Sequence, residues 1–174
     1  MVTTIKKGTS REKIRIALKK RQVKIKSPDL KKYCGSISLT EHPLELQKNG
    51  AMNGSNILLD TNIVLYLLNG EETLIPLLEE KNLYLSFITQ LELLGARYLK
   101  SDDILKIKQF ISECTVIDIT PGIKEIAISI RQKYPVKLPD CIIMATSIWL
   151  NMPLITADHD FMKIDIADLI YFKR

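Results

Sequence analysis

Four acidic residues, far apart in the chain, lie beside segments that are expected to form strands. Asp60 closes the apolar run 56–59, and Asp158 follows a later apolar run. Glu92 is expected early in the helix after the second strand, and Asp140 in the first turn of another helix. Ligands of an open parallel sheet gather outside the carboxyl ends of its strands. We therefore expect these four acids to converge at one edge of the sheet.

Convergence of four carboxylates is costly, because their negative charges repel one another unless cations neutralise them. Mg²⁺ and Mn²⁺ do so by taking carboxylate oxygens as ligands and retaining several waters. Such an ion lowers the pKa of a bound water, orients it for in-line attack and stabilises the charge that builds up on a phosphorane. The spacing thus favours a metal site for phosphodiester hydrolysis, while acids at strand ends also occur as helix caps.

The elements that would position these acids alternate between strand and helix. Strands are predicted at 56–59, 83–86, 116–119, 153–156 and 169–172. Helices are predicted from residue 62 and at 74–80, 89–99, 101–114, 121–134 and 140–150, with Ser101 as an N-cap and a further helical turn at 158–162. Strands separated by helices imply an α/β fold with a parallel sheet covered on both faces.

The composition is that of a globular protein without a membrane span. Apolar residues make up 46% and charged residues 26% of the 174 residues, as in ordinary domains. The longest apolar runs, such as 142–150, fall short of the roughly 20 residues that a spanning helix needs, and no secretory signal follows the basic N-terminus. Three widely spaced cysteines without a Cys-x-x-Cys pair argue against disulfides or zinc and favour a reducing cytoplasm.

The charge is distributed unevenly along the chain. Residues 1–51 carry thirteen Lys or Arg and four Asp or Glu, a net charge of +9, whereas the rest carries twelve and sixteen, a net charge of −4. The basic region holds a capping box at Thr9 and Glu12, an expected strand or extended arm at 36–39 and one or two helical turns at 41–47. It has too few large apolar residues for a core of its own. We expect this arm to bind nucleic acid or to order against the acidic domain beside it.

These patterns divide the chain into a basic segment at 1–49, a linker at 50–55 and a domain at 56–174. The run 49–55 is flexible by composition. Its Gly50-Ala51-Met52 is also the remnant that protease removal of an expression tag commonly leaves before a start methionine. A natural linker and an engineered junction between two natural proteins both remain open.

Four local motifs of the domain resemble those of PIN domains. Residues 56–62, an apolar strand ending in Asp-Thr-Asn, resemble the opening motif, and residues 89–94, Thr-Gln-Leu-Glu-Leu-Leu, resemble the second. Residues 138–146 look like the third, an Asp at a helix start followed by small and apolar residues, and residues 154–161 look like the fourth, Thr-x-Asp ending at an aromatic. Each motif alone is weak, but all four occur in family order over 119 residues, the size of a compact bacterial PIN domain of the VapC toxin type.

The resemblance implies a PIN-like three-layer α/β/α fold with a central parallel sheet, and a Mg²⁺- or Mn²⁺-dependent endoribonuclease that forms a homodimer. It assigns the acidic, metal-binding and catalytic pocket to four residues: Asp60, Glu92, Asp140 and Asp158. Asp60 and Asp140 would bind the metal directly, and the other two would act partly through water. Asn62 and Thr156 would orient carboxylates or waters.

Neighbouring residues have simpler interpretations. The Thr-x-Asp motif favours Asp158 over Asp160 as the site residue, and Asp160 is expected to be a cap or a surface acid. His159 is expected to be exposed rather than catalytic. Trp149 and Phe161 are more typical of a core than of a platform for base stacking.

The basic segment resembles the small VapB-type antitoxin that holds many VapC-type toxins inactive by wrapping them and presenting Arg or Lys to the acidic pocket. The resemblance rests on residues 31–35, Lys-Lys-Tyr-Cys-Gly, and on residues 43–47, Pro-Leu-Glu-Leu-Gln. No helix-turn-helix or ribbon-helix-helix unit is recognisable, so operator DNA would be bound only through the antitoxin. In this hypothesis residues 1–49 lie on the PIN domain, in cis or on a neighbouring chain.

Two functions follow from these resemblances. The first is a toxin-type endoribonuclease with RNA as its substrate and residues 1–49 as its neutralising segment. The second is a PIN nuclease for RNA maturation with a basic arm that binds nucleic acid. A phosphoacceptor receiver domain also gathers acids at strand ends, but it needs an acid pair after its first strand, and the run that ends at Asp60 offers one acid.

Overall fold

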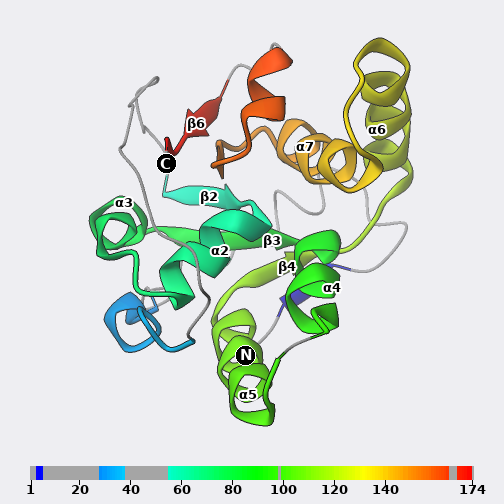
Figure 1. The fold of residues 1–174 in the computed structure, drawn as a ribbon. Helices are drawn as coiled ribbons and strands as arrows, with labels where there is room; N and C mark the ends of the chain where they lie inside the picture. The colour runs from blue at the N-terminus through cyan, green and yellow to red at the C-terminus, as the bar shows by residue number, and fades with distance from the viewer. Residues whose placement is uncertain (1–2, 6–27, 38–54, 98, 165–167, 174) are drawn as a thin grey trace.

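The computed structural model describes residues 3–5, 28–37, 55–97, 99–164 and 168–173. Within these residues, parallel strands form one sheet in the order β1-β4-β3-β2-β5-β6 (Figure 1). The strands are β1 (Thr3–Ile5), β2 (Asn56–Leu59), β3 (Asn82–Ser86), β4 (Thr115–Ile117), β5 (Leu154–Thr156) and β6 (Leu169–Tyr171). The predicted α/β fold with a central parallel sheet is confirmed.

Helices connect the strands. From β2 to β3 the chain passes through α2 (Thr61–Leu68), η2 (Glu72–Leu74) and α3 (Ile75–Leu78), and from β3 to β4 through α4 (Phe87–Gly95) and α5 (Ser101–Glu113). From β4 to β5 it passes through α6 (Pro121–Lys133) and α7 (Leu138–Leu150), and from β5 to β6 through η3 (His159–Lys163). The short 3-10 turn η1 (Leu30–Lys32) lies in the basic N-terminal region. In the part of the chain that the structure describes, no helix is long and apolar enough to cross a membrane.

The alternation of side chains along each strand divides the core into two layers. Ile57 and Leu59 of β2 pack with residues of α2, α3 and α5 on one face of the sheet. Leu58 faces the other way and packs with residues of α6 and α7. Figure 1 shows these two groups of helices on opposite sides of the strands, which is the predicted three-layer arrangement.

The strand order reverses beside β2, and this reversal places the candidate site. β2 lies between β3 and β5, with Leu58 opposite Leu154 and Leu59 opposite Ile155. After β2 the chain crosses to β3, whereas after β5 it turns to β6 on the other side. The connections therefore diverge at the carboxyl ends of these two strands, the place where open α/β sheets bind their ligands.

Part of the basic region packs onto this fold. Leu30, Tyr33 and Ile37 are 2%, 4% and 3% exposed and belong to the same apolar cluster as residues of α2 and α5. β1 pairs with β4 at the edge of the sheet, a strand that the sequence did not predict. The helix expected from the capping box at residue 9 and the turns expected at 41–47 lie outside the described residues.

Several predicted boundaries are corrected. Ser101 is the first residue of α5 and not its N-cap, which is Lys100. The helix predicted at 89–99 begins instead at Phe87, because the Ser86 hydroxyl caps it by accepting a hydrogen bond from the Ile88 N–H at 3.3 Å. The helix predicted at 74–80 is a 3-10 turn followed by four helical residues that end at Leu78.

Candidate active site

Asp60 stands at the carboxyl end of β2 and is 3% exposed. It is the N-cap of α2, and its Oδ1 accepts a hydrogen bond from the Thr61 N–H at 2.7 Å. Its Oδ2 accepts one from Thr156 Oγ1 at 2.7 Å. Burial raises the pKa of Asp60 to about 6. The two hydrogen bonds act against this shift, and the charges of Asp140 and Glu92 add to it. The helix-cap interpretation is thus correct for one oxygen, while the carboxylate as a whole lies in the field of two other acids.

Thr156 ends β5 and is fully buried. Its hydroxyl donates to Asp60 and accepts a hydrogen bond from the Asp158 N–H at 3.0 Å. Asp158 in turn caps η3, because its Oδ1 accepts a hydrogen bond from the Asp160 N–H at 2.8 Å. One hydroxyl therefore ties the side chain of Asp60 to the backbone of Asp158.

Glu92 lies on the exposed side of α4. Its Oε2 accepts a hydrogen bond from Thr61 Oγ1, so Thr61 contacts two acids, Asp60 through its N–H and Glu92 through its hydroxyl. Sequence reasoning missed Thr61, although it is the middle residue of the Asp-Thr-Asn motif. Asn62 is half-buried beside it, and its role in orienting a carboxylate or water stays a prediction.

Asp140 is in the first turn of α7. Its Oδ2 is buried and has no hydrogen-bond partner among the described residues. Burial, followed by the charge of Asp158, raises the pKa of Asp140 to about 6. The charges of Glu92 and Asp160 act in the same direction, and the charge of Lys137 acts against it. A buried acceptor without a donor is unfavourable, and a cation beside this oxygen would satisfy it.

These residues supply the oxygen ligands that hard divalent cations prefer. The raised pKa values of Asp60 and Asp140 arise partly from neighbouring carboxylates, a repulsion that a cation relieves. Within the described ranges, however, no three His, Cys, Asp or Glu side chains lie close enough to hold one ion together. The donor set and the unpartnered oxygen of Asp140 fit a metal, but the carboxylates do not close around a common point.

The residues near the four acids have the surface or core positions that the sequence predicted for them. Asp160 is a surface acid that pairs with Lys163 at 2.6 Å, and His159 is exposed. Phe161 is fully buried, and Trp149 packs against the same core cluster.

Comparison with protein families matches residues 57–167 to the PIN domain. This match spans more than half of the chain, and the chain belongs to the PIN domain family, a family of metal-dependent nucleases. Comparison with curated protein sequences gave no significant match.

Solved structures of toxin–antitoxin complexes resemble this chain. A chain of a toxin–antitoxin complex from Klebsiella pneumoniae is 32% identical with a TM-score of 0.58, over 66% of this chain and 95% of that one. A chain of VapBC-1 from nontypeable Haemophilus influenzae is 25% identical with a TM-score of 0.57, over 67% and 98%. A chain of DNA-bound VapBC from Salmonella typhimurium shares the fold at 20% identity and a TM-score of 0.59, over 67% and 98%. The PIN domain of this chain therefore resembles VapC toxins.

Proposed function

We propose that this chain is a metal-dependent endoribonuclease toxin of a toxin–antitoxin system, neutralised by its own N-terminal segment. The observation that carries the proposal is the linked set of acids where β2 and β5 end. Thr61 joins Asp60 to Glu92, and Thr156 joins Asp60 to the backbone of Asp158. The likeness to a toxin–antitoxin complex at 32% identity favours a toxin over a nuclease for RNA maturation.

In this proposal Asp60 and Asp140 bind Mg²⁺ or Mn²⁺ directly, and Glu92 and Asp158 act partly through water. The metal, when bound, activates a water and stabilises the charge that develops on the scissile phosphate of RNA. Asp60 is held by its two hydrogen bonds, which orient its carboxylate before an ion arrives. Asp140 contributes the buried oxygen that lacks a donor.

Neutralisation by residues 1–49 is supported by their charge of +9 against −4 for residues 52–174. It is also supported by the packing of residues 28–37 on the PIN fold. Lys32 pairs with Glu113, away from the four acids. We propose that any Lys or Arg that enters the acidic pocket comes from another part of residues 1–49.

The wider setting is proposed from the relatives. The VapBC structure from Salmonella typhimurium is bound to DNA, and here operator DNA would be bound through the antitoxin-like segment. The PIN domain would form a homodimer, as VapC-type toxins do. The three cysteines are free, in keeping with a cytoplasmic protein.

Removal of residues 1–51 tests the neutralising role. We expect the shortened chain to cleave RNA with Mn²⁺ and the full chain to cleave it far more slowly, because the segment no longer covers the domain. Excess EDTA should stop the cleavage in both cases. Equal activity of the two chains would reject inhibition by the segment, and no Mn²⁺-dependent cleavage by either would reject the nuclease.

Thr61→Val should weaken Mn²⁺ binding by roughly 10- to 100-fold, the usual effect of losing a group that orients a metal ligand. Valine keeps the volume and the N–H that bonds Asp60, and it removes only the hydroxyl that bonds Glu92. Thr73→Val is a matched control, because Thr73 also donates its hydroxyl to a glutamate, Glu71, outside the site. Isothermal titration with Mn²⁺ measures the affinity, and equal affinities for the two variants would contradict the role of Thr61.

A further inference from the structure

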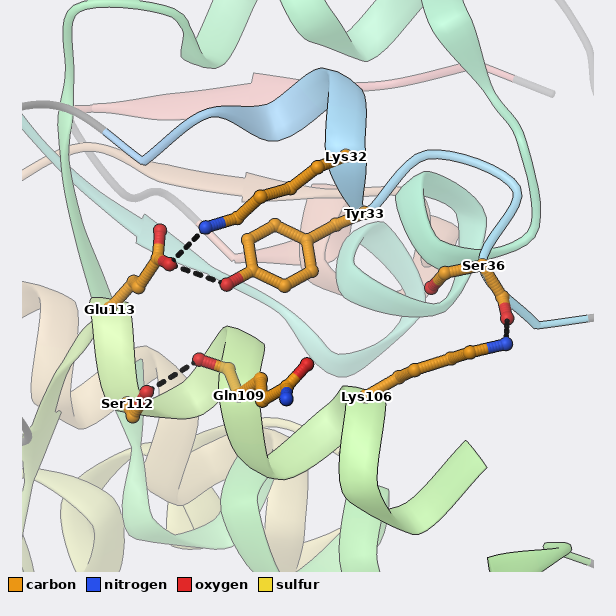
Figure 2. A pocket seen from close by; sticks show the side chains of 7 residues that line it. All are labelled: Lys32, Tyr33, Ser36, Lys106, Gln109, Ser112 and Glu113. Carbon is orange, nitrogen blue, oxygen red and sulfur yellow. Dashed lines mark hydrogen bonds and ion pairs between the residues drawn. The ribbon is translucent and has the colours of Figure 1, made fainter. Parts of the chain in front are cut away.

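Residues 28–37 lie along a seam between the end of α2 and α5. Leu30, Tyr33 and Ile37 are buried there, and the Tyr33 ring meets the Phe110 ring edge-on, with centroids 5.3 Å apart and an interplanar angle of 83°. An open cleft of about 490 Å³ follows the seam, lined by the residues that Figure 2 labels. The segment therefore completes the core with its apolar side chains and leaves its polar ones at the edge of a cleft.

The backbone of the segment bonds the end of α2. The Gly35 N–H donates to Leu67 O at 3.3 Å, and the Ile37 N–H donates to Leu68 O at 2.9 Å. The last carbonyls of a helix have no partner within the helix. Leu67 O also accepts a hydrogen bond from the Gly70 N–H at 3.1 Å, so the segment adds a second donor there and supplies a donor to Leu68 O. Gly35 has a φ of +68°, which favours glycine at this position, and a Cβ here would lie 3.6 Å from the Cα of Gly70.

Glu113, the last residue of α5, contacts two neighbouring residues of the segment. Its Oε1 accepts hydrogen bonds from Lys32 Nζ and from Tyr33 Oη, each at 2.5 Å, and Figure 2 shows both donors pointing at this carboxylate. Although burial acts in the opposite direction, these two bonds lower the pKa of Glu113. Burial and the bond to Glu113 raise the pKa of Tyr33 to about 12, so its hydroxyl stays protonated as a donor.

The position of Glu113 is unfavourable for its own helix. The C-terminal end of a helix carries partial negative charge, so an acid there is destabilising. No basic residue lies in the last turn of α5 to offset it. The described bonds of this carboxylate all go to the segment, which indicates that the acid serves recognition rather than helix stability.

The seam is remote from the candidate active site. α2 begins beside Asp60 and ends at Leu68. Its eight residues span about 12 Å at the usual rise of an α-helix. The segment contacts the C-terminal end of α2, while the acids gather at its N-terminal end. Binding at the seam therefore leaves the four acids untouched.

We propose that residues 28–37 are a recognition segment, and that Glu113 selects it by requiring the pair Lys32-Tyr33. The seam fits a peptide that buries Leu, Tyr and Ile side chains at the spacing of residues 30, 33 and 37. Such a peptide also has a basic residue directly before the tyrosine and a glycine two residues after it. The inference rests on the proposed antitoxin-like role of the segment and adds that recognition is separate from the blocking of the acids. The Lys32 side chain is 48% exposed, so the bond from Tyr33 contributes more than the ion pair.

A double-mutant cycle in the cleaved full chain tests the proposal. A protease site in the linker 50–55 is cut after folding, and native mass spectrometry of a dilution series gives the dissociation constant of the N-terminal fragment. We expect Tyr33→Phe to weaken binding about tenfold, the usual effect of losing a hydrogen bond to a charged group. In the Glu113→Ala background, Tyr33→Phe should have no further effect, because the acceptor is already gone.

Glu125→Ala is the matched control, since Glu125 is an exposed acid on the surface of α6, and it should leave the dissociation constant unchanged. Phenylalanine keeps the packing on Phe110, so weaker binding of the Tyr33→Phe fragment reports the lost hydrogen bond and not a lost apolar contact. Binding unaffected by Tyr33→Phe, or weakened equally with and without Glu113, would overturn the proposal. Cleavage of RNA is assayed separately: a fragment that stays bound without inhibiting cleavage would refute the antitoxin role and leave the recognition by Glu113 standing.

Discussion

Asp140→Asn should lower Mn²⁺-dependent RNA cleavage by about a thousandfold or more, because losing a direct metal ligand removes several kcal/mol of transition-state stabilisation. The fold should stay intact, since the Oδ2 that the substitution replaces has no hydrogen-bond partner among the described residues. The assay uses the chain without residues 1–51, so that the N-terminal segment does not mask the effect.

Asp118→Asn is the control for this prediction. Asp118 directly follows β4 at the same edge of the sheet, and its Oδ1 accepts a hydrogen bond from the Ile119 N–H at 2.8 Å. We expect it to retain parent activity, because it is not among the acids that raise the pKa values of Asp60 and Asp140. Retained turnover in a pure preparation of Asp140→Asn would defeat the mechanism.

Asp60→Asn should stabilise the metal-free protein at pH 7 by about 2 kcal/mol, while abolishing its stabilisation by Mn²⁺. The pKa of Asp60 is raised from 3.8 to about 6 by burial and by neighbouring acids, and a raised carboxyl pKa means that the charged form is disfavoured in the fold. Asparagine removes that charge and its amide oxygen still caps α2. Its amide nitrogen cannot accept the hydrogen bond that Thr156 Oγ1 donates to Asp60 Oδ2, and this loss offsets part of the gain. Chemical denaturation with excess EDTA measures the difference in the free energy of unfolding.

The sign of the pH dependence follows from the same shift. At pH 7 Asp60 is mostly ionised in both states, and the folded state carries the unfavourable charge. As the pH falls through about 6 toward 3.8, the folded state takes up a proton before the unfolded state does, so the parent protein gains stability relative to Asp60→Asn. The advantage of the variant should therefore shrink from pH 7 to pH 4. An advantage that grows on acidification, or none at pH 7, would contradict the burial of an ionised Asp60.

The strands that carry the acids were predictable because each is a short apolar run ended by a polar residue. The run before Asp60 and the run before Ser86 give strands at the predicted places, shifted by one residue at most. The positions of Asp60 and Asp158 at adjacent strand ends follow from that pattern together with the parallel order of the strands.

The choice between Thr61 and Asn62 was not predictable from the pattern. Which of two neighbouring residues in the first turn of α2 reaches Glu92 depends on how that turn is rotated against α4, a tertiary property. The distance between carboxylates is likewise tertiary, and no pattern along the chain fixes it.

The contacts of the basic region depend on residues far away in sequence. β1 pairs with β4, whose residues follow more than a hundred positions later, and the three residues of β1 carry no local signal of that partner. Tyr33 meets Glu113, eighty positions away. Local propensity contains no information about such pairs, so the sequence indicated only that this region lacks a core of its own.

The most direct test of the central claim is anomalous diffraction from crystals of the chain without residues 1–51 soaked in Mn²⁺. We expect a manganese peak among the four acids, with an oxygen of Asp60 and one of Asp140 about 2.2 Å from the ion. Manganese bound only elsewhere, at a concentration that supports RNA cleavage by the chain without residues 1–51, would contradict that claim.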